Sequence, residues 1–259
     1  MNNYPQRIIC LTEETTETLY LLGCQDRIVG ISGFTVRPQE ARREKPKVST
    51  FLDANIDKII ALKPDVVFTF SDLQAEIAKE LIARGIQVVA FNQRSVREIL
   101  QMILIIGGIV GKSPEAEALV ERFEHRLNDI AARSGSGPRP RVYFEEWGNP
   151  LISGICWVSE LIEIAGGEDI FRELRTQHSA RNRIVQPEDV VNRNPDIIIG
   201  SWCGRPFKKE QVRLRPGWER ISAVQKNRLY EITSSIILQP GPAALTDGLD
   251  ALVHIIQHG

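Results

Sequence analysis

Short runs of apolar residues alternate along the chain with longer stretches in which apolar residues recur every three or four positions. The first pattern predicts buried strands and the second predicts amphipathic helices. The expected strands are 7–11, 27–32, 65–70, 86–91, 140–146, 196–201 and 228–233. The expected helices are 15–23, 56–62, 73–84, 95–110, 157–165, 187–193 and 242–257. This alternation predicts an α/β protein with mostly parallel sheets that are covered by helices.

A long helix is expected at the middle of the chain. Ser113 followed by Pro114 is a favourable helix start, because serine caps the helix and proline suits its first position. Apolar residues then recur on one face up to the glycine-rich stretch that begins at Ser134. The expected parts are an N-terminal αβ lobe at 1–112, a linking helix at 113–134 and a C-terminal αβ lobe at 135–259.

The two halves of the chain repeat one another. Residues 56–67 and 187–198 both read as a short helix, a Pro-Asp turn and an apolar strand. Upstream, 17–23 resembles 160–166 in the same order. A Pro-Asp pair commonly follows a helix, so one match would mean little. Two matched segments in the same order favour a duplication. Each half is therefore expected to form one lobe.

Composition limits the possible partners and compartments. The chain has 259 residues, of which 42% are hydrophobic, and 32 basic residues nearly balance 33 acidic ones. The chain has no excess of basic residues that would indicate nucleic-acid binding. Its longest apolar run, 102–110, is too short to cross a membrane. The first residues lack the pattern of a signal peptide. We therefore expect a soluble cytoplasmic protein, or a periplasmic or other extracytoplasmic one if a leader has been removed.

Several segments resemble a known family. The Leu-Lys-Pro-Asp turn before an apolar strand, the turn at 165–171 and the single mid-chain helix resemble the class III periplasmic-binding proteins. In that family one rigid helix bridges two lobes, and the cleft between the lobes captures cobalamin, haem or ferric siderophores for ABC importers. The resemblance implies a non-catalytic binding protein, expected to be a monomer, with a small-molecule ligand and ABC transporter membrane subunits as partners.

The resemblance is greatest to the cobalamin-binding branch. Val48-Ser49-Thr50-Phe51 is similar to a Val-Ser-Thr-Trp segment of that branch, and 149–154 is similar to its Asn-Pro and Thr-Ser-Gly segment. Phe70 stands where the branch has a second tryptophan, Arg37 stands where it has a tyrosine, and the acid and arginine of its last cleft loop are not kept in 234–239. The expected ligand is cobalamin or another corrinoid, with haem or a ferric siderophore as the alternative.

The expected ligand-binding residues are aromatic and polar side chains in loops that would face the cleft. They are Phe34, Arg37, Phe51, Phe70, Glu146, Trp147, Trp157, Trp202, Arg205 and Gln239. Aromatic rings offer a large contact area to a flat macrocycle, and arginine matches carboxylate or carboxamide oxygens. Core packing is an equal alternative for Phe34 and Trp157. Neighbouring strand residues point to opposite faces, so at most one of Glu145 and Glu146 is expected to enter the cleft.

The sequence also bears on catalysis, on metal binding and on docking to a transporter. No catalytic motif is present and no cofactor is expected, although His178 or Cys203 is a conceivable axial metal ligand. The alternative from a different functional class is a cytosolic enzyme or a corrinoid chaperone that uses the same cleft. Asp57 and Glu188 occupy equivalent repeat positions, and the resemblance implies that they dock onto the transporter. Stabilisation of a helix N-terminus is the alternative role for both acids.

Overall fold

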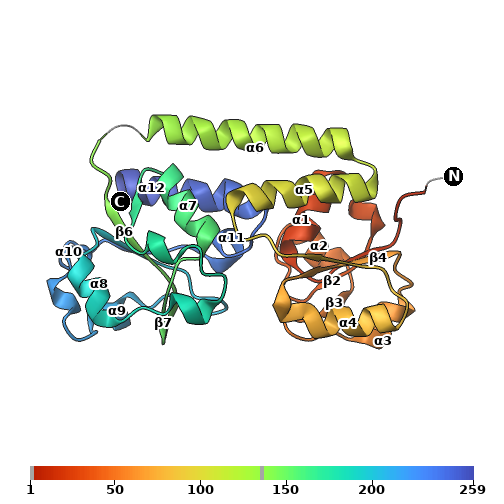
Figure 1. Cartoon of the computed structure of the whole chain (residues 1–259), viewed down its shortest axis with the longest axis horizontal. Helices are drawn as coiled ribbons and strands as arrows, with labels where there is room; N and C mark the ends of the chain where they lie inside the picture. The colour runs from red at the N-terminus through yellow and green to blue at the C-terminus, as the bar shows by residue number, and fades with distance from the viewer. Residues whose placement is uncertain (1–2, 135–136) are drawn as a thin grey trace. The chain divides into compact units, whose positions relative to one another are not determined.

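The computed structural model describes residues 3–134 and 137–259, which form two compact units (Figure 1). The first unit contains the chain up to Gln93 together with Arg97–Arg122, and the second contains Arg94–Val96 and Phe123–Gly259. The expected start of the second lobe at residue 135 lies outside the described residues. Each unit is an αβ lobe with its own sheet, so the predicted two-lobed α/β class is confirmed.

The first unit is built on a parallel sheet of five strands in the order β3-β2-β1-β4-β5. The strands are β1 (Ile8–Cys10), β2 (Ile28–Ser32), β3 (Lys47–Ser49), β4 (Val66–Phe70) and β5 (Val88–Phe91). The helices are α1 (Glu13–Leu21), α2 (Gln39–Glu44), α3 (Ile56–Ala61), α4 (Ala75–Ala83) and α5 (Val96–Val110), with 3₁₀ turns η1 (Gln25–Arg27) and η2 (Asp72–Gln74). Helices α1 and α5 lie on one face of the sheet, and α3 and α4 lie on the other (Figure 1).

The second unit has a sheet in which β6 (Arg141–Gly148) is central. It pairs in parallel with β9 (Ile197–Gly200) and β8 (Glu168–Asp169), and β9 pairs in parallel with β10 (Leu229–Glu231). The antiparallel exception is β7 (Leu151–Ser153), which folds back on the end of β6. The helices are α7 (Cys156–Ile164), α8 (Pro187–Arg193), α9 (Lys209–Arg213), α10 (Ser222–Gln225), α11 (Ser234–Ile237) and α12 (Leu249–His258). The other helical turns are η3 (Arg172–Leu174), η4 (Ala180–Arg183), η5 (Trp218–Arg220) and the π-helical η6 (Ala244–Gly248).

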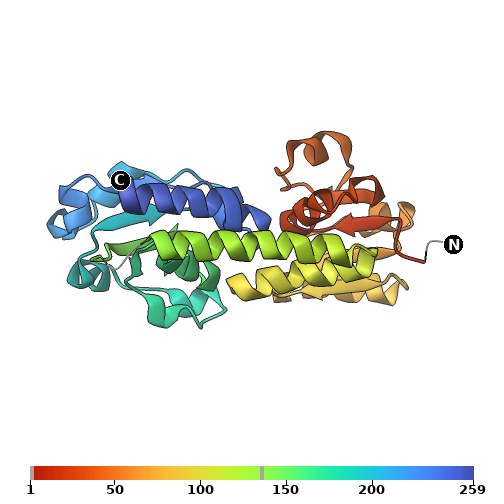
Figure 2. The same ribbon diagram turned by 90° about the horizontal axis from the view of Figure 1, so that it is seen from above.

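Helix α6 (Ser113–Arg133) carries the chain from the first unit into the second. In the first unit it lies beside α5, and a Cβ atom at Gly107 would stand only 2.3 Å from the Cβ of Ala116. In the second unit it lies beside α12, where Arg126 forms an ion pair with Asp250 (Figure 2). None of the described helices is both long enough and apolar enough to span a membrane.

All seven strands expected from the apolar runs are present, because these runs form the buried centre of each sheet. Residues such as Ile9, Val67 and Ile198 have no exposed surface. Burial of one large aliphatic side chain contributes about 1.5–3 kcal/mol. The strands missed by the sequence analysis, β3, β7 and β8, are two or three residues long, so they are too short to show a period.

Candidate ligand-binding site

A cavity of about 680 Å³ opens in the second unit where β6 and β9 end. Its lining combines aromatic, amide and basic side chains with two small residues. The lining residues are Trp147, Gly148, Asn149, Trp202, Arg205, Pro206, Lys208, Gln211 and Arg215. Open α/β sheets bind ligands at the carboxyl ends of their strands, and this cavity has that position.

A buried carboxylate supports the cavity from beneath. Glu145 is in β6 and has no exposed surface. Its two oxygens accept hydrogen bonds from the Arg215 guanidinium at 2.5 and 2.9 Å, and one of them also accepts from the indole N–H of Trp202 at 3.0 Å. A two-pronged arginine–carboxylate pair fixes both geometry and charge. Glu145 therefore holds two of the lining side chains in place.

The Trp202 ring is also held by apolar contacts. It packs edge-to-face on Phe207, with the ring centroids 5.3 Å apart. A Cβ atom at Gly148 would lie 2.5 Å from the Trp202 ring, and one at Gly200 would lie 1.8 Å from the Phe207 ring. Both glycines are thus required for the close approach of these rings to the backbone.

Trp147 forms another part of the cavity wall with Arg205. The indole N–H of Trp147 donates a hydrogen bond to the carbonyl of Asn149 at 2.8 Å. The Arg205 guanidinium lies over the indole ring, 5.3 Å from its centroid. Such stacking leaves the edge of the guanidinium available for hydrogen bonds to a ligand.

A second cavity of about 370 Å³ adjoins the first. The two cavities share Gly148, Asn149 and Arg215, and the second extends toward Leu151 in β7 and Val185. In the first unit, a separate cavity of about 440 Å³ is bordered by α3 and α4. That cavity lies among helices rather than at the carboxyl ends of strands, so we take the larger cavity as the candidate site.

Three predicted residues, Trp147, Trp202 and Arg205, are brought together in this cavity. Other candidates in the second unit lie elsewhere. Glu146 forms an ion pair with the buried Arg183 at 2.6 Å. Trp157 is only 3% exposed and donates its indole N–H to the carbonyl of Ile237, so it occupies the core.

The remaining candidates of the second unit are in loops. Gln239 is half-buried just after α11, and the described cavity lining does not include it. His178 and Cys203 are both exposed. Among the described residues, no group of three or more histidine, cysteine, aspartate or glutamate side chains is arranged to hold a metal ion.

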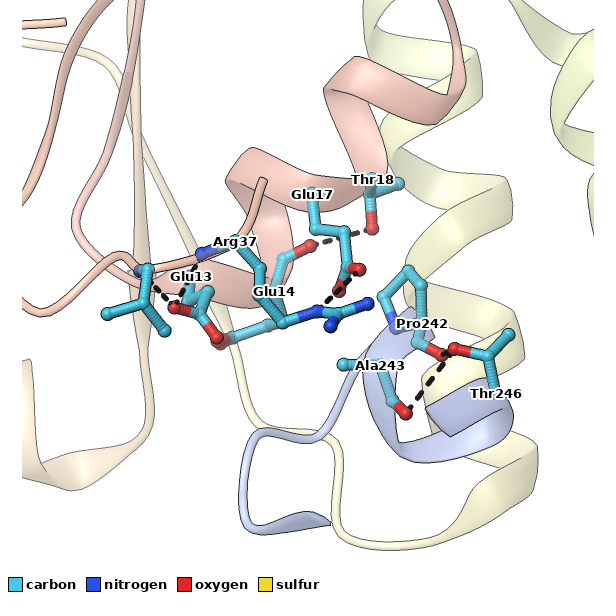
Figure 3. Close-up of polar contacts among 9 residues, drawn as sticks. Glu13, Glu14, Glu17, Thr18, Arg37, Pro242, Ala243 and Thr246 are labelled. Atoms are coloured by element: carbon cyan, nitrogen blue, oxygen red, sulfur yellow. Dashed lines mark hydrogen bonds and ion pairs between the residues drawn. The ribbon is translucent and has the colours of Figure 1, made fainter. Parts of the chain in front are cut away.

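The candidates of the first unit differ in their exposure and contacts. Phe34 is 61% exposed and Phe70 is 5% exposed. Phe51 is half-buried, and its carbonyl accepts a hydrogen bond from the Gln74 amide. Arg37 forms an ion pair with Glu17 at 3.2 Å (Figure 3).

Buried acids occupy the start of α1, close to Arg37. One Glu13 carboxylate oxygen accepts hydrogen bonds from the backbone N–H groups of Val36 and Arg37 (Figure 3). Burial raises the pKa of Glu13 to about 7, against the lowering effect of these hydrogen bonds. Burial likewise raises the pKa of Glu14, which is 1% exposed, to about 7. The α1 terminus thus contains two carboxyl groups that titrate near neutral pH.

The two predicted docking acids have equivalent local positions. Asp57 is the second residue of α3, and Glu188 is the second residue of α8. Both are exposed, and 95% of the Asp57 side chain is accessible. The Asp57 carboxylate lies 4.0 Å from the Arg84 guanidinium. Their exposure leaves both carboxylates accessible to a partner.

Sequence reasoning missed Lys208, Gln211 and Arg215 as parts of this site, and of the two neighbouring acids it selected Glu146 rather than Glu145. One available signal was the period of two in a strand, which places Glu145 on the same face as Trp147 and Glu146 on the opposite face. No comparable signal exists for Arg215, because it reaches Glu145 from a loop 70 residues further along the chain.

The architecture and the site define a two-lobed α/β binding-protein fold. The chain belongs to the periplasmic binding protein family, whose model matches residues 8–236. It is 28% identical over 268 aligned positions to an uncharacterized ABC transporter substrate-binding lipoprotein of Bacillus subtilis, covering 97% of this chain and 80% of that protein. It is 23% identical to a vitamin B12-binding protein of Vibrio parahaemolyticus, covering 100% of this chain and 91% of that protein.

A solved structure shares the fold over almost the whole chain. A possible iron-binding, periplasmic solute-binding protein from Staphylococcus epidermidis superimposes with a TM-score of 0.84 at 23% identity. The match covers 98% of this chain and 99% of that one. At this level of identity the likeness establishes the two-lobed fold.

Proposed function

We propose that the protein binds cobalamin or another corrinoid and releases it chemically unchanged. It would act as the substrate-binding component of an ABC importer or as a stand-alone carrier. The observation that carries the proposal is the cavity of about 680 Å³ with Trp147 and Trp202 in its wall. Relatives named as an ABC substrate-binding lipoprotein and a vitamin B12-binding protein support this choice of ligand and system.

The cavity suits a flat ring better than a small polar solute. Two indole rings supply apolar contact area at little cost in side-chain entropy, and Asn149 and Gln211 supply amide groups near them. Ligand pockets typically combine apolar walls with a few fixed polar groups of this kind. A corrin ring with amide side chains matches both features.

Binding without chemistry is supported by the composition of the wall. None of the described lining residues is a serine, cysteine, histidine, aspartate or glutamate. The nearby carboxylate, Glu145, is fully buried and already accepts three hydrogen bonds. A cytosolic enzyme that reuses this site would need its reactive groups to come from elsewhere.

A haem or ferric chelate is the second candidate ligand. Arg205 and Lys208 favour it, because guanidinium and ammonium groups bind the carboxylates that haem carries and many ferric chelates contain. The same two tryptophans would then stack on the porphyrin. This candidate keeps the binding role and changes only the ligand.

Spectroscopic titration tests the proposal and separates its two ligands. Purified protein is titrated with cyanocobalamin and with haemin, and the bound ligand is afterwards released and analysed by mass spectrometry. We expect saturable binding of cyanocobalamin at one site and recovery of the same compound. Saturable binding of haemin alone would favour the second candidate. Recovery of an altered corrinoid would contradict the carrier role.

We assign transporter docking to Asp57 and Glu188. The two carboxylates are exposed, one in each unit, and each is the second residue of a helix. Arginine side chains on the membrane subunits would be suitable partners for them. Import further requires an extracytoplasmic location, which fractionation of cells that express the natural gene would establish.

A further inference from the structure

We propose that Arg205 and Lys208 form an anion-binding subsite, which receives a phosphate or carboxylate group of the ligand while Trp147 and Trp202 contact its ring. This inference rests on the proposed ligand-binding function and specifies the chemistry of the ligand. It selects ligands with a negatively charged oxygen group over uncharged analogues of the same ring.

The described wall of the cavity is positively charged. Its charged lining residues, as far as the chain is described, are Arg205, Lys208 and Arg215, and no acid is among them. The Arg215 charge is neutralised by the Glu145 carboxylate, which binds both ends of the guanidinium. Two positive charges therefore remain at the cavity.

The two remaining cations are Arg205 and Lys208. Within the described chain, neither Arg205 nor Lys208 has an acidic side chain within ion-pair distance. The nearby acids are already engaged, because Glu145 binds Arg215, Glu146 binds Arg183 and Glu231 accepts the backbone N–H of Phe207. These networks leave the charges of Arg205 and Lys208 available to a ligand.

Arg205 is oriented by an aromatic contact. Its guanidinium lies over the Trp147 ring, and the Trp147 indole is itself anchored on the Asn149 carbonyl. Stacking restricts the guanidinium to the plane of the ring face, which reduces the entropy lost when its N–H groups bind an oxygen anion. An aromatic wall beside an oriented guanidinium suits a flat ligand with an acidic substituent.

Two matched ligand pairs test the subsite and identify the source of the anion. Cyanocobalamin is compared with dicyanocobinamide, which lacks the nucleotide loop and its phosphate, and haemin is compared with its dimethyl ester. We expect the charged member of at least one pair to bind about 10- to 100-fold more tightly. A preference for cyanocobalamin that Arg205→Gln removes identifies phosphate, and a preference for free haemin that Arg205→Gln removes identifies carboxylate.

The variants Arg205→Gln and Lys208→Gln should remove most of this preference, whereas Arg172→Gln, at an exposed site outside the cavity lining, should retain it. Equal binding within both pairs would overturn the inference. Equal weakening of charged and uncharged members by Arg205→Gln would also overturn it, because the residue would then contribute only contact area.

A measurement without macrocycles tests the anion-binding subsite separately from the proposed ligand class. Trp157 and Trp218 are at most 3% exposed, so collisional quenching of tryptophan fluorescence reports mainly on Trp147 and Trp202. We expect iodide to quench more strongly than neutral acrylamide, and Arg205→Gln to reduce only iodide quenching. If iodide shows this preference but no macrocycle binds, the proposed ligand class fails and the subsite stands. Iodide quenching that is unaffected by the variant overturns the subsite.

Discussion

The carboxylate of Glu145, fully buried in β6, binds the guanidinium of Arg215 through both of its oxygens, at 2.5 and 2.9 Å. This pair joins the central strand of the second unit to the loop before η5, and it positions the wall of the cavity. Arg215 also lies over the ring of the buried Trp218, 4.4 Å from its centroid. The cavity is thus attached to the core of the unit by a buried ion pair.

Removal of one partner of this pair should be costly. Glu145→Ala leaves the Arg215 charge and the Trp202 N–H without their acceptor, so we expect a loss of about 3–5 kcal/mol in the free energy of unfolding. The double variant Glu145→Leu, Arg215→Met should recover part of this loss, because it leaves no buried charge unpaired. Urea denaturation followed by circular dichroism measures both values. A loss below about 1 kcal/mol in the single variant would contradict the role of the pair.

Gly148 should control the position of the Trp202 ring. In Gly148→Ala the added methyl group would lie 2.5 Å from the ring, so the indole must move. We expect ligand affinity to fall about tenfold, as judged by the binding titration. Gly108→Ala is a matched control, because a Cβ at Gly108 meets no atom within 4 Å. Equal affinity of the two variants would show that Trp202 is not held in place for binding.

The buried acids of α1 should make stability depend on pH. The pKa values of Glu13 and Glu14 rise from 4.5 to about 7 on folding, so the folded state binds more protons between these values. The contribution of Glu13 and Glu14 to the free energy of unfolding should therefore be highest below about pH 4.5. This contribution should fall as the pH rises to about 7.

The variant Glu14→Gln isolates this effect. We expect it to raise the free energy of unfolding at pH 8 by on the order of 1–3 kcal/mol and to leave it nearly unchanged at pH 4. Thermal denaturation at both pH values tests the difference, with the exposed Glu76→Gln as a control. A variant that destabilises the protein at pH 8 would show that the Glu14 carboxylate is ionised and bound in the folded state.

Reversal of the two exposed acids tests transporter docking. The double variant Asp57→Lys, Glu188→Lys should bind ligand normally but fail to stimulate ATP hydrolysis by the reconstituted transporter. Glu76→Lys, Glu219→Lys provides the same change of charge at other exposed positions. The alternative role at a helix N-terminus predicts normal stimulation with a loss of about 0.3–1 kcal/mol of stability for each acid.

The fold could be predicted well from the sequence, because each lobe consists of buried apolar strands between amphipathic helices. Runs such as Val66–Phe70 and Ile197–Gly200 are buried along their whole length, so they read clearly as strands. The antiparallel β7 was not predicted from the sequence, because its three residues follow a tight turn after β6 and show no period of their own.

The site could be predicted only in part. Trp147 and Trp202 stand within three positions of the ends of the apolar runs 142–144 and 197–200, so the sequence alone places them near strand ends. Trp157 has the same residue type but is in the first turn of α7, where its ring turns into the core. The Glu145–Arg215 pair depends on the tertiary fold of a loop, and no local pattern encodes it.

The most direct test of the central claim is the dissociation constant of cyanocobalamin, measured by spectroscopic titration for the unmodified protein and for Trp147→Ala and Trp202→Ala. Ile82→Ala removes another exposed apolar side chain outside the cavity lining and serves as the control. Each tryptophan variant should weaken binding by about 1–3 kcal/mol, or about 5- to 150-fold, while Ile82→Ala binds like the unmodified protein. Unchanged affinity in both tryptophan variants would contradict the assignment of the ligand site to this cavity.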